Sequence, residues 1–327
     1  MKKITALLLA LLLALSLCTM GAAAADETVT IVLEPADDTL LTAEGLALFF
    51  VDRDAITEET ETSVSWYKET AKDGKTDPEA LKAALGDNAA CFYVQQPNFF
   101  GQIEDTVALG EITHAAGAKF VMGVNPIACA LLPTPREVGA DVAVGDGQPL
   151  GLDTAFGGPY LGFMATTSAM TRKLPGRIVG ETKDVDGKTG YVLTLSAREQ
   201  HIRREKASSN ICSNQALCAF TAGIYMTAMG EDGMKQCARL CTSKAHYLAS
   251  ELEKIGCKLK YTGEFFHEFV TETACPNCRK KILDALAEKN ILGGAEVDGG
   301  ILWCVTELVP KEKLDEVVAI VKEVLGK

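Results

Sequence analysis

Short apolar runs and longer amphipathic segments alternate along the chain from about residue 70 onward. Asp77 followed by Pro78 is typical of a helix start, with an acidic N-cap and a proline in the first turn. Residues 105–116 carry apolar positions at helical spacing. Four apolar runs predict buried strands, at residues 89–95, 119–124, 140–144 and 161–165. Strands and helices in this alternation predict an α/β fold, with right-handed crossovers and a mostly parallel sheet.

The C-terminal part has a different pattern, because two long helices at residues 211–229 and 231–255 lead into a small α+β domain. We therefore divide the chain into residues 1–25, 26–70, 71–245 (large domain) and 246–327 (small domain). In the small domain the pattern predicts strands near 258–262, 265–271, 291–296 and 301–306, and helices near 277–289 and 310–325.

The N-terminus has the three-part layout of a secretory signal peptide. Lys2 and Lys3 precede an apolar run over residues 4–18, and small residues lead to an expected cleavage after Ala25. This pattern predicts export, and an uncleaved membrane anchor is the alternative. Residues 26–70 contain strand-like stretches at 28–33 and 46–51 and no chemical motif.

Composition limits the function classes. With 47% apolar and 23% charged residues the chain is globular rather than disordered. Its net charge of −12 argues against nucleic-acid partners and anionic membranes. No later stretch is long and apolar enough to predict a membrane domain. The eleven cysteines are scattered and need no disulfide framework.

Candidate chemistry lies first at the carboxyl ends of the strands, where ligands of open α/β sheets gather. These loops contain Gln96, Asn98, Asn125 and residues 145–148, and a glycine pair at Gly157 and Gly158 follows. The glycine pair is more simply a tight turn.

The second candidate is a cationic stretch in an otherwise acidic chain. With a helix start after it, the stretch predicts an anion site, whereas the alternative is a solvated helix with i,i+4 pairs. The stretch and the expected N-cap comprise Arg198, Glu199, Gln200, His201, Arg203, Arg204, Lys206, Ser208 and Asn210.

Cys275 and Cys278 form a Cys-x-x-Cys pair before an expected helix. A zinc site needs further ligands at suitable spacing, and no second pair follows. We therefore interpret the two as incidental thiols, rank zinc or redox use last, and expect no metal.

Several long strings together resemble the glycine-cleavage P-protein family, and within it the alpha subunit of the two-subunit glycine dehydrogenase. They cover residues 96–101, 145–148, 156–159, 173–182 and 197–212. The resemblance implies a type I pyridoxal-phosphate fold, present here in part, and an oxidoreductase of glycine catabolism. It also implies glycine decarboxylation, aminomethyl transfer to the lipoyl H-protein, a beta-subunit partner and a cytoplasmic location.

Two positions depart from a catalytic member of the family. Gln148 stands where the resemblance places the Schiff-base lysine, and Asn125 stands where it places the acid opposite the pyridine nitrogen. Glutamine has no amine for an aldimine, and a neutral amide supplies no charge. We therefore expect no catalytic residue and no covalent cofactor in this chain, with pyridoxal phosphate in the beta subunit. The cationic stretch would then contact anions or the partner near the shared active site.

The resemblance begins near residue 70 and leaves out the family's longer N-terminal part. A chain shortened at its N-terminus and fused to a signal peptide is therefore expected, inactive alone. The alternatives are a non-enzymatic exported binding protein, a non-functional truncated or chimeric product, and a self-sufficient pyridoxal-phosphate enzyme that uses another lysine.

Overall fold

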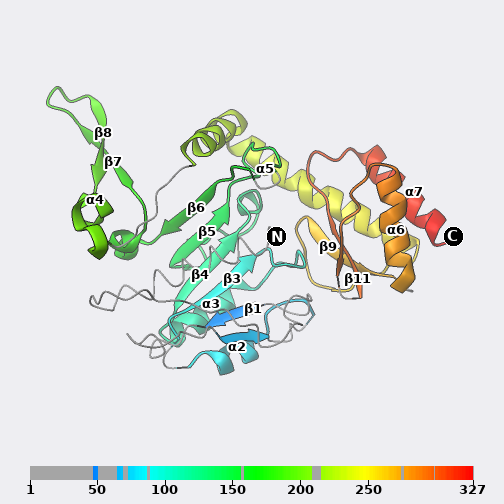
Figure 1. Ribbon diagram of the computed structural model, residues 1–327. Coiled ribbons are helices and arrows are strands. Elements are labelled where there is room, and N and C mark those ends of the chain that lie inside the picture. Colours follow the sequence, from blue (N-terminus) through cyan, green and yellow to red (C-terminus); the bar gives the residue numbers. More distant parts are fainter. Residues whose placement is uncertain are drawn as a thin grey trace.

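The computed structural model describes residues 47–50, 65–68, 73–86, 89–155, 158–207, 215–273, 276–297 and 299–326. In the first two segments only the backbone is described. The expected signal peptide and the strand expected at 28–33 lie outside the described residues. The strand expected at 46–51 is β1 (Ala47–Phe50), which pairs antiparallel with β2 (Ser65–Lys68) and lies beside the central sheet (Figure 1).

The central sheet has the order β3 (Cys91–Gln96), β4 (Lys119–Val124), β5 (Val142–Asp146) and β6 (Gly162–Thr166). The first three strands are parallel, as predicted, and their continuous apolar runs are buried. The fourth strand is the exception, because β6 pairs antiparallel with β5. The described residues between β5 and β6 contain no helix, and a parallel return needs a long crossover.

Two helices cover one side of this sheet, and both begin at an aspartate. The side chain of Asp77 accepts a hydrogen bond from the backbone of α2 (Pro78–Ala84), and Asp105 caps α3 (Thr106–Ala115) in the same way. Buried Leu81 and Leu109 pack with the sheet residues Phe92 and Phe120, whose rings stack at 6.1 Å. Apolar burial, at about 25 cal/mol per Å², is the main force that joins these layers.

A long helix, α5 (Ala216–Lys254), connects the sheet to the C-terminal part (Figure 1). It breaks at Gly230, whose φ of 62° and ψ of −175° are not helical, so the two helices predicted from the sequence are confirmed. Residues 208–214, which include the expected start of the first helix, lie outside the described residues. Leu248 and Leu252 of the second half are buried in the C-terminal core.

The C-terminal part is an antiparallel sheet with the order β10 (Ala295–Val297), β11 (Gly300–Cys304) and β9 (Glu268–Glu272). Helices α6 (Pro276–Glu288) and α7 (Lys311–Val324) pack against it. The predicted α+β pattern is therefore confirmed, except for the strand expected near 258–262. There the structure has only an isolated bridge from Leu259 to Thr271. Backbone hydrogen bonds between Lys260 and Val270 and between Glu272 and Lys258 hold this stretch beside β9, and Tyr261 packs on Phe100 with ring centroids 4.7 Å apart.

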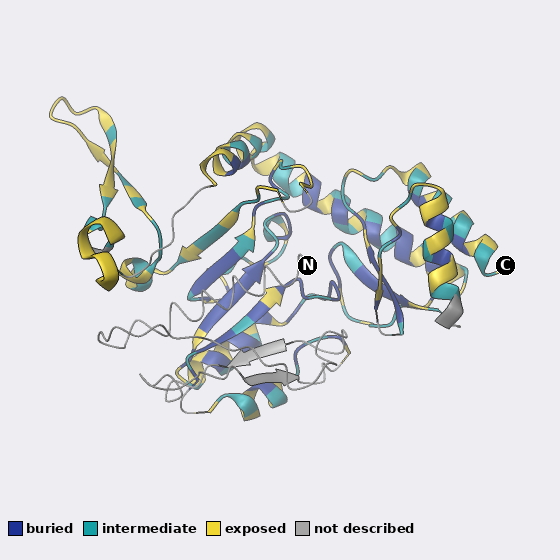
Figure 2. Cartoon of the chain, in the orientation of Figure 1, coloured by how far each residue is buried: buried dark blue, intermediate teal, exposed yellow. Residues whose placement is uncertain are grey.

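A hairpin projects from the body of the molecule and consists of β7 (Ile178–Lys183) and β8 (Thr189–Thr194) (Figure 1). Its turn lies between Lys183 and Thr189. Three short helical turns follow it: η6 (Ser196–Arg198), α4 (Gln200–Arg203) and η7 (Arg204–Lys206). Most of this projection is exposed (Figure 2). Within the part of the chain that the structure describes, no helix has the length and apolarity to cross a bilayer.

Candidate functional site

The carboxyl ends of β3 and β4 meet, as the strand pattern predicted. The Gln96–Pro97 peptide bond is cis, and the backbone N–H of Asn125 donates a 3.1 Å hydrogen bond to the carbonyl of Gln96. Asn125 follows β4 directly, and Gln148 follows β5 by two residues. The structure therefore places the candidate residues of three loops along one edge of the sheet.

Asn98 is almost completely buried and uses its whole amide to hold this edge together. Its Oδ1 accepts hydrogen bonds from the backbone N–H groups of Phe100 (3.0 Å) and Gln102 (3.1 Å). Its Nδ2 donates to the carbonyl of Gly74 (2.8 Å) and to Oε1 of Glu104 (2.7 Å). An amide offers two donors and two acceptor sites, so Asn98 has none left for a ligand.

Gln96 and Glu104 extend this network. Oε1 of Gln96 accepts from the backbone N–H of Glu104 at 2.9 Å, and Nε2 of Gln96 donates to the Glu104 carbonyl. The Glu104 carboxylate accepts from the backbone N–H of Thr76 at 3.0 Å. Burial raises the pKa of Glu104 above its usual value, although hydrogen bonds from Asn98 and Thr76 oppose that rise. These contacts give Gln96 and Asn98 a structural role at the strand end.

The same loop attaches the C-terminal part to the sheet. The N–H of Ile103 donates to the Glu264 carbonyl at 2.9 Å, and the N–H of Phe266 donates to the Gly101 carbonyl at 3.1 Å. Gly101 has a φ of +79°, and a Cβ there would lie 1.8 Å from the carbonyl oxygen of Glu268. Only glycine permits this approach, which fixes the two parts of the molecule against each other at the strand ends.

Asn125 and Gln148 use their amides to order their own loops. Oδ1 of Asn125 accepts from the N–H groups of Ile127 (2.9 Å) and Ala128 (3.2 Å), at the start of η4 (Ala128–Ala130). Nε2 of Gln148 donates to the Leu152 carbonyl at 2.6 Å. Both side chains are half-buried, and both hold backbone groups at the edge where a cofactor would bind in this kind of fold.

The glycine pair gives little further information. Gly158 is exposed, and its N–H closes a turn to the Ala155 carbonyl at 2.8 Å, in agreement with a simple turn. Gly157 lies outside the described residues. Gly151 is more informative, because it has a φ of +81° and its Cβ position lies 2.8 Å from the ring of Tyr225 on α5. The loop after β5 therefore packs closely on that helix.

The cationic stretch lies far from these loops in the chain fold, beside the projecting hairpin (Figure 1). Glu199 is half-buried. The side chain of Arg198 is not described, and Ser208 and Asn210 lie outside the described residues. Within the described part of the chain, the side chains of His201, Arg203, Arg204 and Lys206 form no ion pair. The i,i+4 pairs of the solvated-helix alternative therefore do not occur for them. The exposed residues of the stretch are Gln200, His201, Arg203, Arg204 and Lys206.

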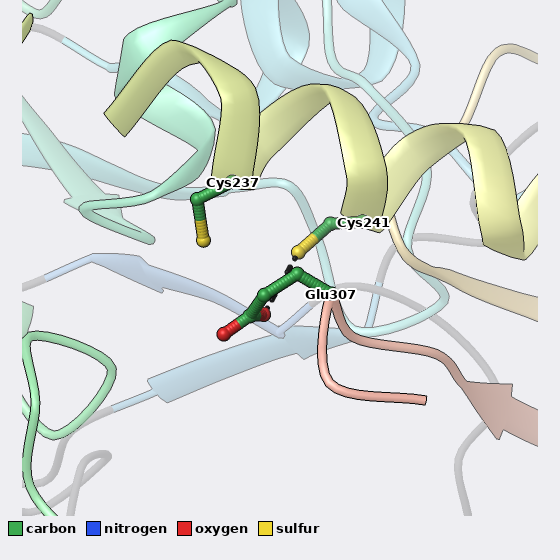
Figure 3. A group of neighbouring side chains, drawn as sticks. All are labelled: Cys237, Cys241 and Glu307. Atoms are coloured by element: carbon green, nitrogen blue, oxygen red, sulfur yellow. Dashed lines mark hydrogen bonds between the residues drawn. The ribbon is translucent and has the colours of Figure 1, made fainter. Parts of the chain in front are cut away.

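One cluster was not predicted from the sequence. It lies where α5 contacts the chain segment that follows β11. Cys237 and Cys241 are both buried, and the thiol of Cys241 donates to Oε2 of Glu307 at 3.3 Å (Figure 3). Burial is the main cause that raises the pKa of each thiol, and Glu307 adds to it. The available signal was the four-residue spacing of the two cysteines, which places them on one helix face.

The Cys-x-x-Cys pair needs a correction. Cys278, in the first turns of α6, takes part in a disulfide bond, so the expectation of a free thiol there is wrong. Cys275 lies outside the described residues. A cysteine at a helix start is well placed for such chemistry, because the helix dipole favours its thiolate.

The glycine cleavage system P-protein model matches residues 15–321 of this sequence. The chain belongs to the glycine cleavage system P-protein family. This match confirms the resemblance seen in the sequence strings, and it begins upstream of residue 70, where that resemblance was expected to start. The boundary near residue 70 remains a prediction.

Curated relatives of the family are identical to the chain at about half of the aligned positions. The probable glycine dehydrogenase (decarboxylating) subunit 1 of Desulfitobacterium hafniense is 50% identical over 261 residues, which are 77% of this chain and 58% of that protein. The protein of the same name from Bacillus thuringiensis is 47% identical over 254 residues, covering 76% and 56%. The chain thus spans a little over half the length of these relatives.

Solved structures agree with the family and the fold. A glycine decarboxylase (P-protein) of the glycine cleavage system, in inhibitor-bound form, is 39% identical, with a TM-score of 0.72 over 78% of this chain and 58% of that one. The alanine–glyoxylate aminotransferase of Nostoc sp. is 17% identical, with a TM-score of 0.58 over 95% and 78%. The latter likeness concerns the fold alone, which is a mixed α/β fold of the aminotransferase-like kind.

Proposed function

We propose that this chain is the alpha-type subunit of a two-subunit glycine dehydrogenase. In this role it supports glycine decarboxylation and aminomethyl transfer to the lipoyl arm of the H-protein, and it is inactive alone. The family match and the relatives named subunit 1 support this proposal, since a first subunit implies a second. The aminotransferase-like architecture supports the further proposal that the fold is part of a type I pyridoxal-phosphate fold.

The observation that carries the proposal is the pair of neutral amides at the strand ends. Pyridoxal phosphate would supply an electron sink where it binds, and its site needs an amine and an acid. At the matching positions Gln148 donates to the Leu152 carbonyl, and Asn125 accepts from the backbone N–H groups of Ile127 and Ala128. These residues do not fit the cofactor, because neither can carry the required charge or form the imine. The proposal therefore assigns the cofactor to the partner subunit.

Exposed apolar side chains supply the surface that a partner subunit requires. They lie on the projecting hairpin, on α4 and on the exposed side of the first half of α5 (Figure 2). Contiguous exposed apolar surface on a soluble protein marks interaction sites. The exposed cations of the stretch at 198–206 lie beside the hairpin and would contact an acidic partner surface. The apolar residues concerned are Val179, Tyr191, Val192, Leu193, Ile202, Leu217, Phe220, Ile224 and Met226.

The test is the exchange of glycine carboxyl carbon with bicarbonate, measured with a family beta subunit, pyridoxal phosphate and lipoylated H-protein. The proposal predicts that the complete mixture exchanges faster than the mixture without this chain. A Tyr191→Asp and Phe220→Asp double variant should lose most of that gain. Because both side chains are well exposed, the double variant should unfold at the parent's temperature.

A matched control is Val185→Asp, at the fully exposed tip of the hairpin. It should keep the gain, because Val185 lies in the turn, outside the strands and helices whose side chains form the proposed surface. Exchange that the chain does not increase would overturn the proposal. An absorbance band of an internal aldimine in the isolated chain, lost on borohydride treatment, would instead favour a self-sufficient enzyme.

A further inference from the structure

The buried cluster of Cys237, Cys241 and Glu307 has no part in the function proposed above. Its two sulfur atoms and one carboxylate oxygen all lie within 4.8 Å of one another (Figure 3). Two thiols from α5 and a carboxylate from the segment after β11, at such distances, form a donor set rather than an apolar contact. The surrounding residues Ile127, Leu150 and Phe266 are apolar and buried, as are both cysteines, whereas Glu307 is half-buried.

The geometry is close to that of a tetrahedral metal centre. With Zn–S bonds of about 2.3 Å, tetrahedral angles place two sulfur ligands about 3.8 Å apart. The observed upper limit of 4.8 Å therefore requires a contraction of less than about 1 Å. Cys237 and Cys241 lie one helical turn apart on α5, so small rotations of their side chains achieve this without moving the backbone.

We propose that Cys237, Cys241 and Glu307 bind a zinc ion, with a water molecule in the fourth position. Glu307 is half-buried, so this side of the cluster is open enough to admit that water. His267 lies just before β9, and its ligand atom lies within 4.8 Å of those of Glu268 and Cys304 instead.

Binding replaces one proton on each thiol by a bond to zinc, and both protons pass to the solvent. Two thiolates and one carboxylate carry three negative charges against two positive charges on the ion. The ammonium group of Lys244, which donates a hydrogen bond to the Glu307 carbonyl, lies nearby to offset the excess. Without metal, the Cys241 thiol donates to Glu307 instead, as the structure shows. The hydroxyl of Tyr225, 4.0 Å from the sulfur of Cys237, also faces the site.

Thiolates favour zinc over magnesium and calcium, which prefer oxygen ligands alone. A second group, His267 with Glu268 and Cys304, also has ligand atoms within 4.8 Å of one another. It has one thiol only, and Cys304 is exposed. It is therefore the weaker site, and Cys304→Ser separates the two experimentally.

The experiment titrates Co²⁺, and then Zn²⁺, into the reduced full-length chain. Cobalt bound as proposed gives thiolate-to-metal charge-transfer absorption in the near ultraviolet and the visible bands of tetrahedral cobalt, and zinc removes both. Cys237→Ser and Cys241→Ser should each roughly halve the charge-transfer absorption, because one of two Co–S bonds is lost, and weaken binding at least about tenfold. Cys218→Ser, another buried cysteine on the same helix, should leave both unchanged.

Glu307→Gln keeps both thiols and tests the third ligand, so the proposal stays testable if a serine variant does not fold. It should weaken cobalt binding about tenfold or more, whereas His267→Ala should leave the binding unchanged. Zinc should also raise the unfolding temperature of the parent but not that of Glu307→Gln. The proposal is overturned if the parent gives no thiolate–cobalt absorption, or if the absorption survives Cys241→Ser and Glu307→Gln but is lost in Cys304→Ser.

Discussion

Asn98 offers the sharpest test of how the strand-end loops are held. In Asn98→Ala the backbone N–H groups of Phe100 and Gln102 and the Gly74 carbonyl lose their partner, and Glu104 loses a hydrogen bond of 2.7 Å. At about 1 kcal/mol for each of the four bonds, the expected loss in the free energy of unfolding is about 4 kcal/mol. A loss of that size is exceptional for one substitution and results from the burial of the whole network.

Asn125→Ala is the matched control, because it makes the same chemical change at the next strand end. Asn125 is half-buried, and its Oδ1 accepts two hydrogen bonds within its own loop, so the expected loss is about 1 kcal/mol. Urea unfolding followed by far-ultraviolet circular dichroism measures both variants against the parent. Equal losses in the two variants, or a loss below about 1.5 kcal/mol for Asn98→Ala, would refute the reasoning that burial of the network sets its contribution.

Three further predictions follow from neighbouring features. Gly101→Ala should lower the free energy of unfolding by more than about 3 kcal/mol, because its Cβ would clash with the Glu268 carbonyl. Gly117 has a similar φ but lies in open space, so Gly117→Ala should lose only about 1 kcal/mol. Thermal unfolding of both variants measures the difference. Burial raises the pKa of Glu104 in the folded state above its pKa in the unfolded state. Its protonated form therefore contributes stability that is fully present below the unfolded-state pKa and is lost as pH rises through the folded-state pKa. The urea midpoint of Glu104→Gln relative to the parent should therefore increase from acid to neutral pH, and a decrease would contradict the assigned direction. Trp303→Phe should lose about 1 kcal/mol, because the indole N–H donates to the Thr271 hydroxyl at 2.8 Å in the core, and an unchanged unfolding midpoint would contradict that role.

The sequence predicted the elements whose signals are local. Asp77 and Asp105 predicted two helix starts, and the apolar run at 119–124 matched β4 residue by residue. The pattern near 258–262 predicted a strand, whereas the structure has a single bridge to β9 and packs Tyr261 on Phe100, more than 150 residues away, which no local pattern encodes. The antiparallel β6 was missed for a similar reason, since strand direction depends on the path of the chain after β5.

The candidate site, too, was predicted from the sequence only in part. Residue type alone showed that Gln148 and Asn125 cannot perform the chemistry of a lysine and an acid, and the structure adds that their amides hold backbone groups. By contrast, Asn98 was predicted as a loop residue near a ligand, and its four buried hydrogen bonds became visible only with the fold. The Cys237–Cys241–Glu307 cluster joins residues 66 positions apart, and such a contact needs the tertiary structure.

The central claim is that the chain completes a partner's active site without holding the cofactor itself. Its most direct test titrates the chain into a fixed amount of beta subunit, with pyridoxal phosphate and lipoylated H-protein in excess, and measures glycine–bicarbonate exchange. The account predicts a rate that rises with added chain and levels off at one chain per beta subunit. A rate that stays at the level of the beta subunit alone, at every ratio, would contradict it.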